Sequence, residues 1–205
     1  MTDMGDVSHI LGMEVKHKYE KGTLAIIQKA YVDSILERFG MHDFNATHTP
    51  RYGPELSVEQ PGSKLLNPAA MELYQSITDS LLYLPQCTRY NMCYTVNQLT
   101  RACSKLAEIH MAAAKHALRY LQRTPDLSIV LKRGQFRMVS YTDASFGANP
   151  DNRKSTTGYI FFLGGGLISF GSKTQSLTAQ STVEGELQAL SYETREAVYL
   201  SNFLI

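Results

Sequence analysis

The stretch YTDASFGANPDNRKSTTGYIFFLGGG, residues 141–166 of this 205-residue sequence, combines the strongest strand and turn signals in the chain. One apolar strand is predicted to run up to Asp143, and a turn rich in Asn, Asp and basic residues follows it. A second strand ends in three glycines, Gly164–Gly166, which favour a hairpin into a further strand over GLISFGS. The stretch therefore predicts a strand-rich region with an acidic side chain at the end of one strand.

A single long helix is predicted after these strands, over residues 182–205, and Glu186 lies near its start. If this helix packs across the strands, the carboxylates of Asp143 and Glu186 can converge on a divalent cation such as Mg²⁺, which prefers oxygen ligands. Asp143 is equally explained as a turn or cap residue, and Glu186 as an exposed helical residue. Helical spacing predicts that the buried stripe of this helix contains Leu187, Leu190, Thr194, Ala197, Val198 and Leu204.

The first two thirds of the chain are predicted to be rich in helix. A hairpin around Gly22 is followed by a helix over 29–40 and by a long irregular connection over 41–68. Pro85 is predicted to end the next helix, which covers 69–84. The buried stripe of that helix is expected to contain Leu73, Ile77, Leu81 and Leu84.

Two further helices are predicted over 90–103 and 105–124, before short strand-like runs begin after Pro125. This change from helical to strand-like patterns indicates a domain boundary near residues 125–135 and an α+β fold class. Three tyrosines on the predicted helices are explained either as core residues or as platforms for base stacking, namely Tyr83, Tyr90 and Tyr94.

Positive charge is concentrated between residues 105 and 180, which hold ten Lys and Arg against four Asp and Glu. A basic row recurs at i, i+4 and i+8 on one predicted helix and consists of Lys115, Arg119 and Arg123. Such a row can follow a phosphate backbone or can simply be a solvated face. Arg153 and Lys154 lie in the turn between the first two strands of the opening stretch. They either contact the phosphates of a nucleic acid, or Arg153 pairs with Asp151.

The sequence excludes several other classes of protein. Its longest mostly apolar run, YIFFLGGGLISF, is much shorter than the roughly 20 residues that a membrane-spanning helix needs. The N-terminus lacks the basic and apolar blocks of a signal peptide. Cys87, Cys93 and Cys103 have no metal-type spacing, so we expect free thiols. We therefore expect an intracellular protein with no secretion signal and no membrane partner.

The sequence resembles the Pol polyprotein of copia-type long-terminal-repeat retrotransposons along nearly its whole length. ILGMEV at 10–15 is similar to the family's FLGIEI palm strand, and ALRYLQRTPDLSIVL at 117–131 is similar to its LRYLKGT segment. The strongest likeness, over 141–190, is to the family's ribonuclease H signature, with the RKST and GGG islands in register. The resemblance implies that residues 1–130 are the end of a reverse-transcriptase palm plus thumb and connection. It implies that 135–205 are a truncated ribonuclease H-like domain, a partial α/β sheet with one long helix.

This resemblance implies a fragment of an enzyme that acts on RNA–DNA hybrids. Ribonuclease H domains cut the RNA strand with two divalent metals, Mg²⁺ or Mn²⁺, which four acids hold. Asp143 matches the first of these acids and Glu186 matches the acid on the helix, while Glu184 is a weaker candidate for that role. The third and fourth acids of the family lie beyond the matched segment, and its polymerase YVDD pair lies before it.

We therefore expect both active sites to be incomplete in this chain, with the missing remainder of the Pol polyprotein as a partner. Whether the chain is an enzyme stays open at this point. The alternative is a non-catalytic nucleic-acid-binding protein, or a relic derived from a retroelement. Under either interpretation the candidate contacts to nucleic acid are Lys115, Arg119, Arg123, Arg153 and Lys154.

Overall fold

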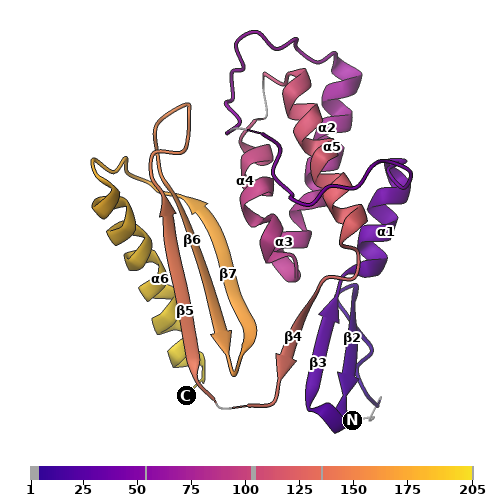
Figure 1. Cartoon of the computed structure of the whole chain (residues 1–205), viewed down its shortest axis with the longest axis vertical. Coiled ribbons are helices and arrows are strands. Elements are labelled where there is room, and N and C mark those ends of the chain that lie inside the picture. Colours follow the sequence, from indigo (N-terminus) through magenta and orange to yellow (C-terminus); the bar gives the residue numbers. More distant parts are fainter. Residues whose placement is uncertain (1–4, 54, 103–104, 135, 205) are drawn as a thin grey trace.

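The computed structural model describes residues 5–53, 55–102, 105–134 and 136–204. It has an α+β architecture, in which a group of helices lies beside two separate antiparallel sheets (Figure 1). The third cysteine, Cys103, and residue 135, the predicted start of the second domain, lie outside the described residues. Cys87 and Cys93 are free thiols, as expected. Within the described ranges, no helix is both long and apolar enough to cross a membrane.

The first sheet joins the start of the chain to a strand from its middle. Its order is β1 to β4, with bounds His9–Ile10, Met13–Lys18, Thr23–Ile27 and Ser128–Lys132. The predicted hairpin between β2 and β3 is present, and a short 3-10 helix, η1 (Tyr19–Lys21), precedes Gly22 in the left-handed region at φ 55°. β4 pairs with β3 along its whole length, so residues up to Lys132 belong to the first sheet.

The helical group contains most of the buried apolar residues. Its bounds are α1 Lys29–Arg38, α2 Pro68–Leu82, α3 Leu84–Cys87, η2 Tyr90–Met92, α4 Cys93–Arg101 and α5 Glu108–Arg123. The Asn67 side chain caps α2 by accepting from the Ala70 N–H at 2.9 Å. The fully buried centre of the group is formed by Ile77, Leu81, Leu84, Leu99, Leu118 and Leu121.

Two details of the predicted α2 helix are wrong. Leu73 is 42 % exposed, and Tyr74 is buried in its place because its hydroxyl donates to the Leu99 carbonyl of α4 at 2.8 Å. The helix also ends at Leu82, before Pro85. Pro85 instead lies in the first turn of α3, where its missing N–H leaves no helical hydrogen bond unmade.

Leu81 and Leu73 provide a matched test of this orientation, because they are the same residue type on the same helix. Leu81→Ala should lower the free energy of unfolding by about 2–5 kcal/mol, because it leaves a cavity in the core. Leu73→Ala should cost less than about 1 kcal/mol, because its side chain already contacts water. Urea denaturation of both variants measures the difference, and equal losses would contradict the orientation of α2.

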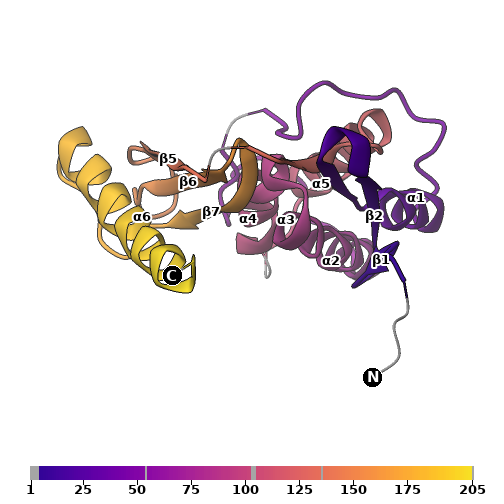
Figure 2. The ribbon, with the colours of Figure 1, turned by 90° about the horizontal axis from the view of Figure 1, so that it is seen from below.

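The second sheet contains most of the stretch 141–166. Its order is β5 (Met138–Ser145), β6 (Thr156–Leu163) and β7 (Gly166–Thr174), all antiparallel. The predicted glycine hairpin joins β6 to β7, with Gly164 and Gly165 at positive φ. Helix α6 (Thr182–Leu204) covers one face of this sheet, and the helical group lies on its other side (Figure 2).

The predicted buried stripe of α6 is wrong. Leu187 is 59 % exposed, and Leu190, Thr194, Val198 and Leu204 are also exposed, while Ala197 is only partly buried. The residues buried against the sheet are Gly185, Ala189 and Glu193. The sheet contributes to this outcome, because its aromatic side chains occupy space beneath the helix. The ring of Tyr159 on β6, for example, packs against Tyr192 of α6 with centroids 5.7 Å apart.

Candidate functional site

Asp143 lies near the end of β5, opposite Gly158 of β6. Because side chains alternate along a strand, it shares a face with Tyr141, the face turned toward the helical group. Its exposed carboxylate borders a cleft of about 370 Å³, which η2 and α4 close from the other side. The strand therefore holds one acid rigidly at an open position, as the sequence predicted.

Glu186 lies in the first turns of α6 and is exposed. Its neighbour Gly185 faces inward, where a Cβ atom would lie 3.5 Å from the Ser155 hydroxyl and 3.7 Å from the Phe146 ring. Phe146 directly follows β5, so the start of α6 and the end of β5 meet at one end of the sheet. Both predicted acids are thus at the same end, but α6 packs on the face opposite Asp143.

Within the described part of the chain, no hydrogen bond or ion pair joins Asp143 to Glu186. No group of three or more His, Cys, Asp or Glu in those residues is arranged to hold a metal ion. The two carboxylates are the right donor type for Mg²⁺, but a shared cation would need further ligands. The catalytic roles of Asp143 and Glu186 stay predictions.

Glu184, the weaker candidate, has a structural task at the start of α6. Its N–H donates to the Ser181 hydroxyl at 3.1 Å, and its carboxylate accepts from the Gln180 N–H at 2.7 Å. This is close to the reciprocal pattern of a capping box, which satisfies the free N–H groups of a helix start. The carboxylate of Glu184 is therefore already engaged, whereas that of Glu186 accepts no hydrogen bond from the described residues.

The edge of β5 is open beside Asp143. Among the described strands β5 pairs only with β6, so the backbone groups along its other edge have no strand partner. Such an edge is a template for pairing with a further strand. A strand added there would lie directly next to Asp143 and could contribute side chains to the same site.

The basic row on α5 is only partly free. The Arg119 side chain donates to the carbonyl of Asn45, and its own carbonyl accepts from the Thr47 N–H at 3.3 Å. Arg119 thus holds the connection after α1 in place. Lys115 and Arg123 are exposed, and neither forms an ion pair with any described residue. Burial lowers the pKa of His116 between them, so that ring adds little positive charge at neutral pH.

The turn with Arg153 and Lys154 does not contain the ion pair between Arg153 and Asp151 that the sequence offered as one alternative. Asp151 does not pair with Arg153. Its carboxylate instead accepts from the Ser57 hydroxyl and from the Val58 N–H at 3.1 Å, which ties the β5–β6 turn to the connection after α1. Arg153 has a positive φ of 58°, and its guanidinium lies beside Gly147. Arg153 and Lys154 form no ion pair among the described residues.

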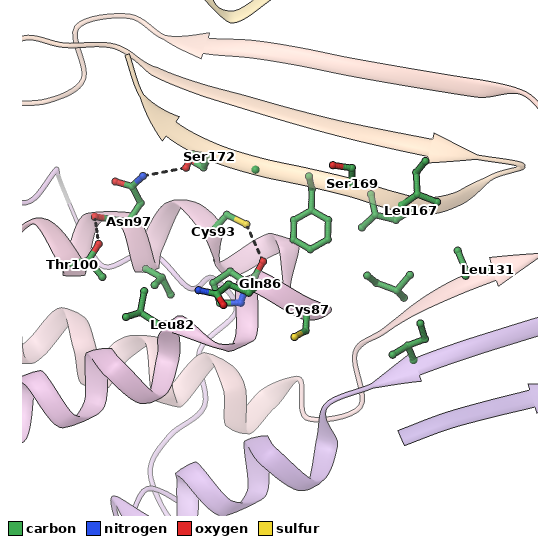
Figure 3. A pocket seen from close by; sticks show the side chains of 17 residues that line it. Leu82, Gln86, Cys87, Cys93, Asn97, Thr100, Leu131, Leu167, Ser169 and Ser172 are labelled. Carbon is green, nitrogen blue, oxygen red and sulfur yellow. Dashed lines mark hydrogen bonds between the residues drawn. The ribbon is translucent and has the colours of Figure 1, made fainter. Parts of the chain in front are cut away.

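A second, larger cleft of about 800 Å³ lies between α3, α4 and the two sheets (Figure 3). The described residues that line it carry no charge, and the thiols of Cys87 and Cys93 border it. The Asn97 side chain crosses one end and donates to the Ser172 carbonyl at 3.2 Å. Sequence reasoning missed this cleft because its walls come from elements that are far apart in the chain.

Burial raises the pKa of the Cys93 thiol to about 11. With Cys93 as the sole cysteine, in a Cys87→Ser, Cys103→Ser variant, the alkylation rate should rise about tenfold per pH unit from pH 8 to 10. The reason is that the thiolate reacts, and its fraction keeps growing until the pH approaches the pKa. A blocked peptide with one cysteine, whose thiol pKa is an ordinary value of about 8.5, serves as the control, and its alkylation rate should level off above about pH 9. A plateau for Cys93 at the same pH would contradict the burial.

Comparison with known proteins gives a consistent set of relatives. The chain is 33 % identical to the retrovirus-related Pol polyprotein from transposon TNT 1-94 of Nicotiana tabacum, over 100 % of the chain and 16 % of the relative. It is 33 % identical to the Pol polyprotein from transposon RE1 of Arabidopsis thaliana, over 100 % of the chain and 14 % of the relative. It is also 38 % identical to secreted RxLR effector protein 161 of Plasmopara viticola, over 62 % of the chain and 91 % of the relative.

The chain thus spans only 16 % and 14 % of the two Pol polyproteins that it matches over its full length. No protein-family model matches the sequence, and no solved structure matches it either. The relatives therefore indicate where the chain belongs, whereas the arrangement of its site comes from its own structure.

Proposed function

This chain belongs to the retrovirus-related Pol polyproteins of copia-type transposons, and from that premise we propose that it forms part of a reverse transcriptase–ribonuclease H unit. In this proposal residues 1–130 form the end of the palm with thumb and connection, and residues 135–205 form the first half of a ribonuclease H domain. The substrate is an RNA–DNA hybrid, handled inside the cell in a cytoplasmic particle or the nucleus. The observation that supports the proposal most is the exposed Asp143 on an open edge strand, at the sheet end where α6 begins.

Asp143 and Glu186 are the residues that would hold Mg²⁺ or Mn²⁺. When bound, two such metals activate a water molecule and stabilise the leaving oxygen of a phosphodiester. The chain's own contribution is to position the ligands. Strand β5 fixes Asp143, and the close packing of Gly185 fixes the start of α6.

We propose that this site is completed by other parts of the Pol polyprotein. Two carboxylates on opposite sides of β5 are fewer than a two-metal centre needs, and the open edge of β5 offers a place for a further strand. The polymerase site is likewise proposed to take its catalytic acids from outside this segment. The chain alone should therefore have little or no polymerase activity and weak ribonuclease H activity at best.

A cleavage assay tests this proposal with a labelled RNA–DNA hybrid and Mg²⁺ or Mn²⁺. One arm uses the 205-residue chain, and the other uses a chimera in which this chain replaces the aligned segment of the tobacco Pol polyprotein. We expect cutting of the RNA strand by the chimera and little or none by the chain alone. Robust cutting by the chain alone that Asp143→Asn abolishes would refute the incompleteness. No cutting by a folded chimera would refute the nuclease function.

A second candidate is a non-catalytic nucleic-acid-binding or relic protein. It is favoured by one observation: the matched region makes up 91 % of the Plasmopara viticola relative, so it also occurs in proteins that contain little else. Under this candidate the chain binds a hybrid with a steep dependence on salt, and the chimera binds it equally but does not cut. The two arms of the cleavage assay therefore separate the candidates.

A further inference from the structure

Aromatic side chains from two parts of the chain form part of the lining of the cleft beside Asp143. η2 contributes Tyr90, β5 contributes Tyr141, and β7 contributes Phe170. Tyr90 is 42 % exposed and Tyr141 is 64 % exposed, so both rings are open to a ligand. Both are nevertheless supported by rings behind them. Tyr90 packs edge-to-face on Phe170 with centroids 5.9 Å apart, and Tyr141 packs in the same way on Phe162 at 6.3 Å.

Charge in this cleft is confined to one end. Asp143 is the only formally charged residue among the described residues that line it, and the other lining residues are uncharged. A volume of about 370 Å³ is near the lower limit for small-molecule sites, so the cleft suits a single planar group rather than a duplex. A neutral aromatic wall beside a carboxylate that would hold a cation matches one nucleotide, whose base is planar and whose phosphate is anionic.

The two walls are held together by contacts between the helical group and the second sheet. Asn97 of α4 donates to the Ser172 carbonyl of β7 at 3.2 Å, and Asp151 binds Ser57 and Val58. The aromatic walls are therefore placed in advance, which lowers the entropic cost of binding. A tyrosine from the predicted connection thus lies next to the predicted nuclease acid.

We propose that this cleft binds one unpaired nucleobase of the strand whose phosphate lies at Asp143, with Tyr90 and Tyr141 as positioning residues that stack on it. This inference rests on the proposed function for the role of Asp143. Stacking on aromatic side chains tolerates any base, because every base has a π face. The expected ligand is consequently a single-stranded segment, such as an overhang next to the hybrid, without sequence preference.

A fluorescence experiment on the whole chain tests the site without metal or cleavage. The sequence contains no Trp, so Tyr90→Trp introduces a single reporter into the cleft. In EDTA, a single-stranded hexanucleotide should quench its emission, and a hexamer of abasic sugar-phosphates should not. The control is Tyr199→Trp, at a tyrosine of α6 that is 63 % exposed and is not among the residues lining the cleft, where we expect no quenching.

Substitutions at the second tyrosine measure the contribution of stacking. In the Tyr90→Trp background, Tyr141→Ala should lower the affinity for the hexanucleotide by about fivefold to a hundredfold. Tyr141→Phe should leave this affinity unchanged. Fluorescence anisotropy of a labelled hexamer with Tyr90→Ala gives the same comparison without Trp. Circular dichroism checks that each variant is folded.

Several outcomes would overturn the inference. The first is equal binding of the hexanucleotide and the abasic hexamer. The second is equal quenching of the Tyr199→Trp control. The third is a cationic peptide that binds in the cleft when the hexanucleotide does not. Because no divalent metal is present, the result is independent of the nuclease assay. If the chimera cleaves but the hexanucleotide does not stack in the cleft, only this inference is contradicted. If the hexanucleotide stacks but the chimera does not cleave, only the proposed nuclease function is contradicted.

Discussion

Replacing Asp143 by Asn in the tobacco chimera should lower the rate of RNA-strand cleavage by roughly a thousandfold, if the proposed nuclease function holds. The change keeps the size of the side chain but removes the negative charge that would hold the metal. The expected loss is large because stabilising charge in the transition state is the main contribution at such a site. Single-turnover cleavage at saturating Mg²⁺ measures it, so that weaker substrate binding does not enter the rate.

Asp126→Asn is the matched control for this experiment. Asp126 is an exposed aspartate on the loop before β4, where it pairs with Lys29 across 3.6 Å, so its loss should leave the rate nearly unchanged. A second pair comes from α6. Glu186→Gln should slow cleavage to a similar degree as Asp143→Asn, whereas Glu184→Gln should mainly weaken the helix cap by about 1 kcal/mol. If Glu184→Gln proves to be the more damaging change, the assignment of the helical acid is wrong.

Hybrid binding by the chain should fall by roughly a hundredfold when the salt concentration rises from 50 to 200 mM. This size corresponds to about four phosphate contacts, because each contact releases counterions on binding. Four candidates have side chains that form no ion pair or hydrogen bond with the described residues, namely Lys115, Arg123, Arg153 and Lys154. Arg119 is not counted, because its side chain already binds the connection. Anisotropy of a labelled blunt hybrid in EDTA measures the slope.

The double variant Lys115→Ala, Arg123→Ala should reduce the magnitude of that slope by about two. Lys18→Ala, Lys21→Ala removes the same charge from the first hairpin, at exposed positions away from the row, and should leave the slope unchanged. Equal effects of the two double variants would mean that net charge alone drives binding. A slope near zero for the parent chain would argue against any phosphate-tracking surface.

Local signals predicted local structure well. Strand β6, Thr156–Leu163, forms where the sequence predicted a strand before the three glycines, because its β-branched and aromatic run lies between a turn and a glycine hairpin. The hairpin around Gly22 was also predicted, since a left-handed residue is needed there. In each case the residues that decide the structure are neighbours in the sequence.

Features that depend on distant residues were not predictable. β4 joins the first sheet because it pairs with β3, about a hundred residues earlier in the chain. The buried side of α6 depends in part on Tyr159 on the sheet and not only on the apolar residues of the helix. The fixed position of Arg119 likewise depends on a loop carbonyl at Asn45, which leaves no periodic trace in the sequence.

The same distinction applies to the candidate site. Asp143 was predicted from its place at the end of an apolar strand, and the structure keeps it exposed there. The neighbouring Tyr90 could not be placed beside it, because the two residues come from different parts of the fold. The sequence also could not predict which face of the second sheet α6 covers, since that depends on how the connection after β7 crosses the sheet.

Manganese binding to the chimera tests the central claim most directly, because it asks whether Asp143 and Glu186 share a cation. Mn²⁺ titrations followed by water proton relaxation compare the parent with Asp143→Asn, Glu186→Gln and the double variant. We predict that each single variant weakens Mn²⁺ binding and that the double variant is little worse than either, as expected for ligands of one site. Unchanged binding in Glu186→Gln, or losses that simply add, would contradict a shared metal centre.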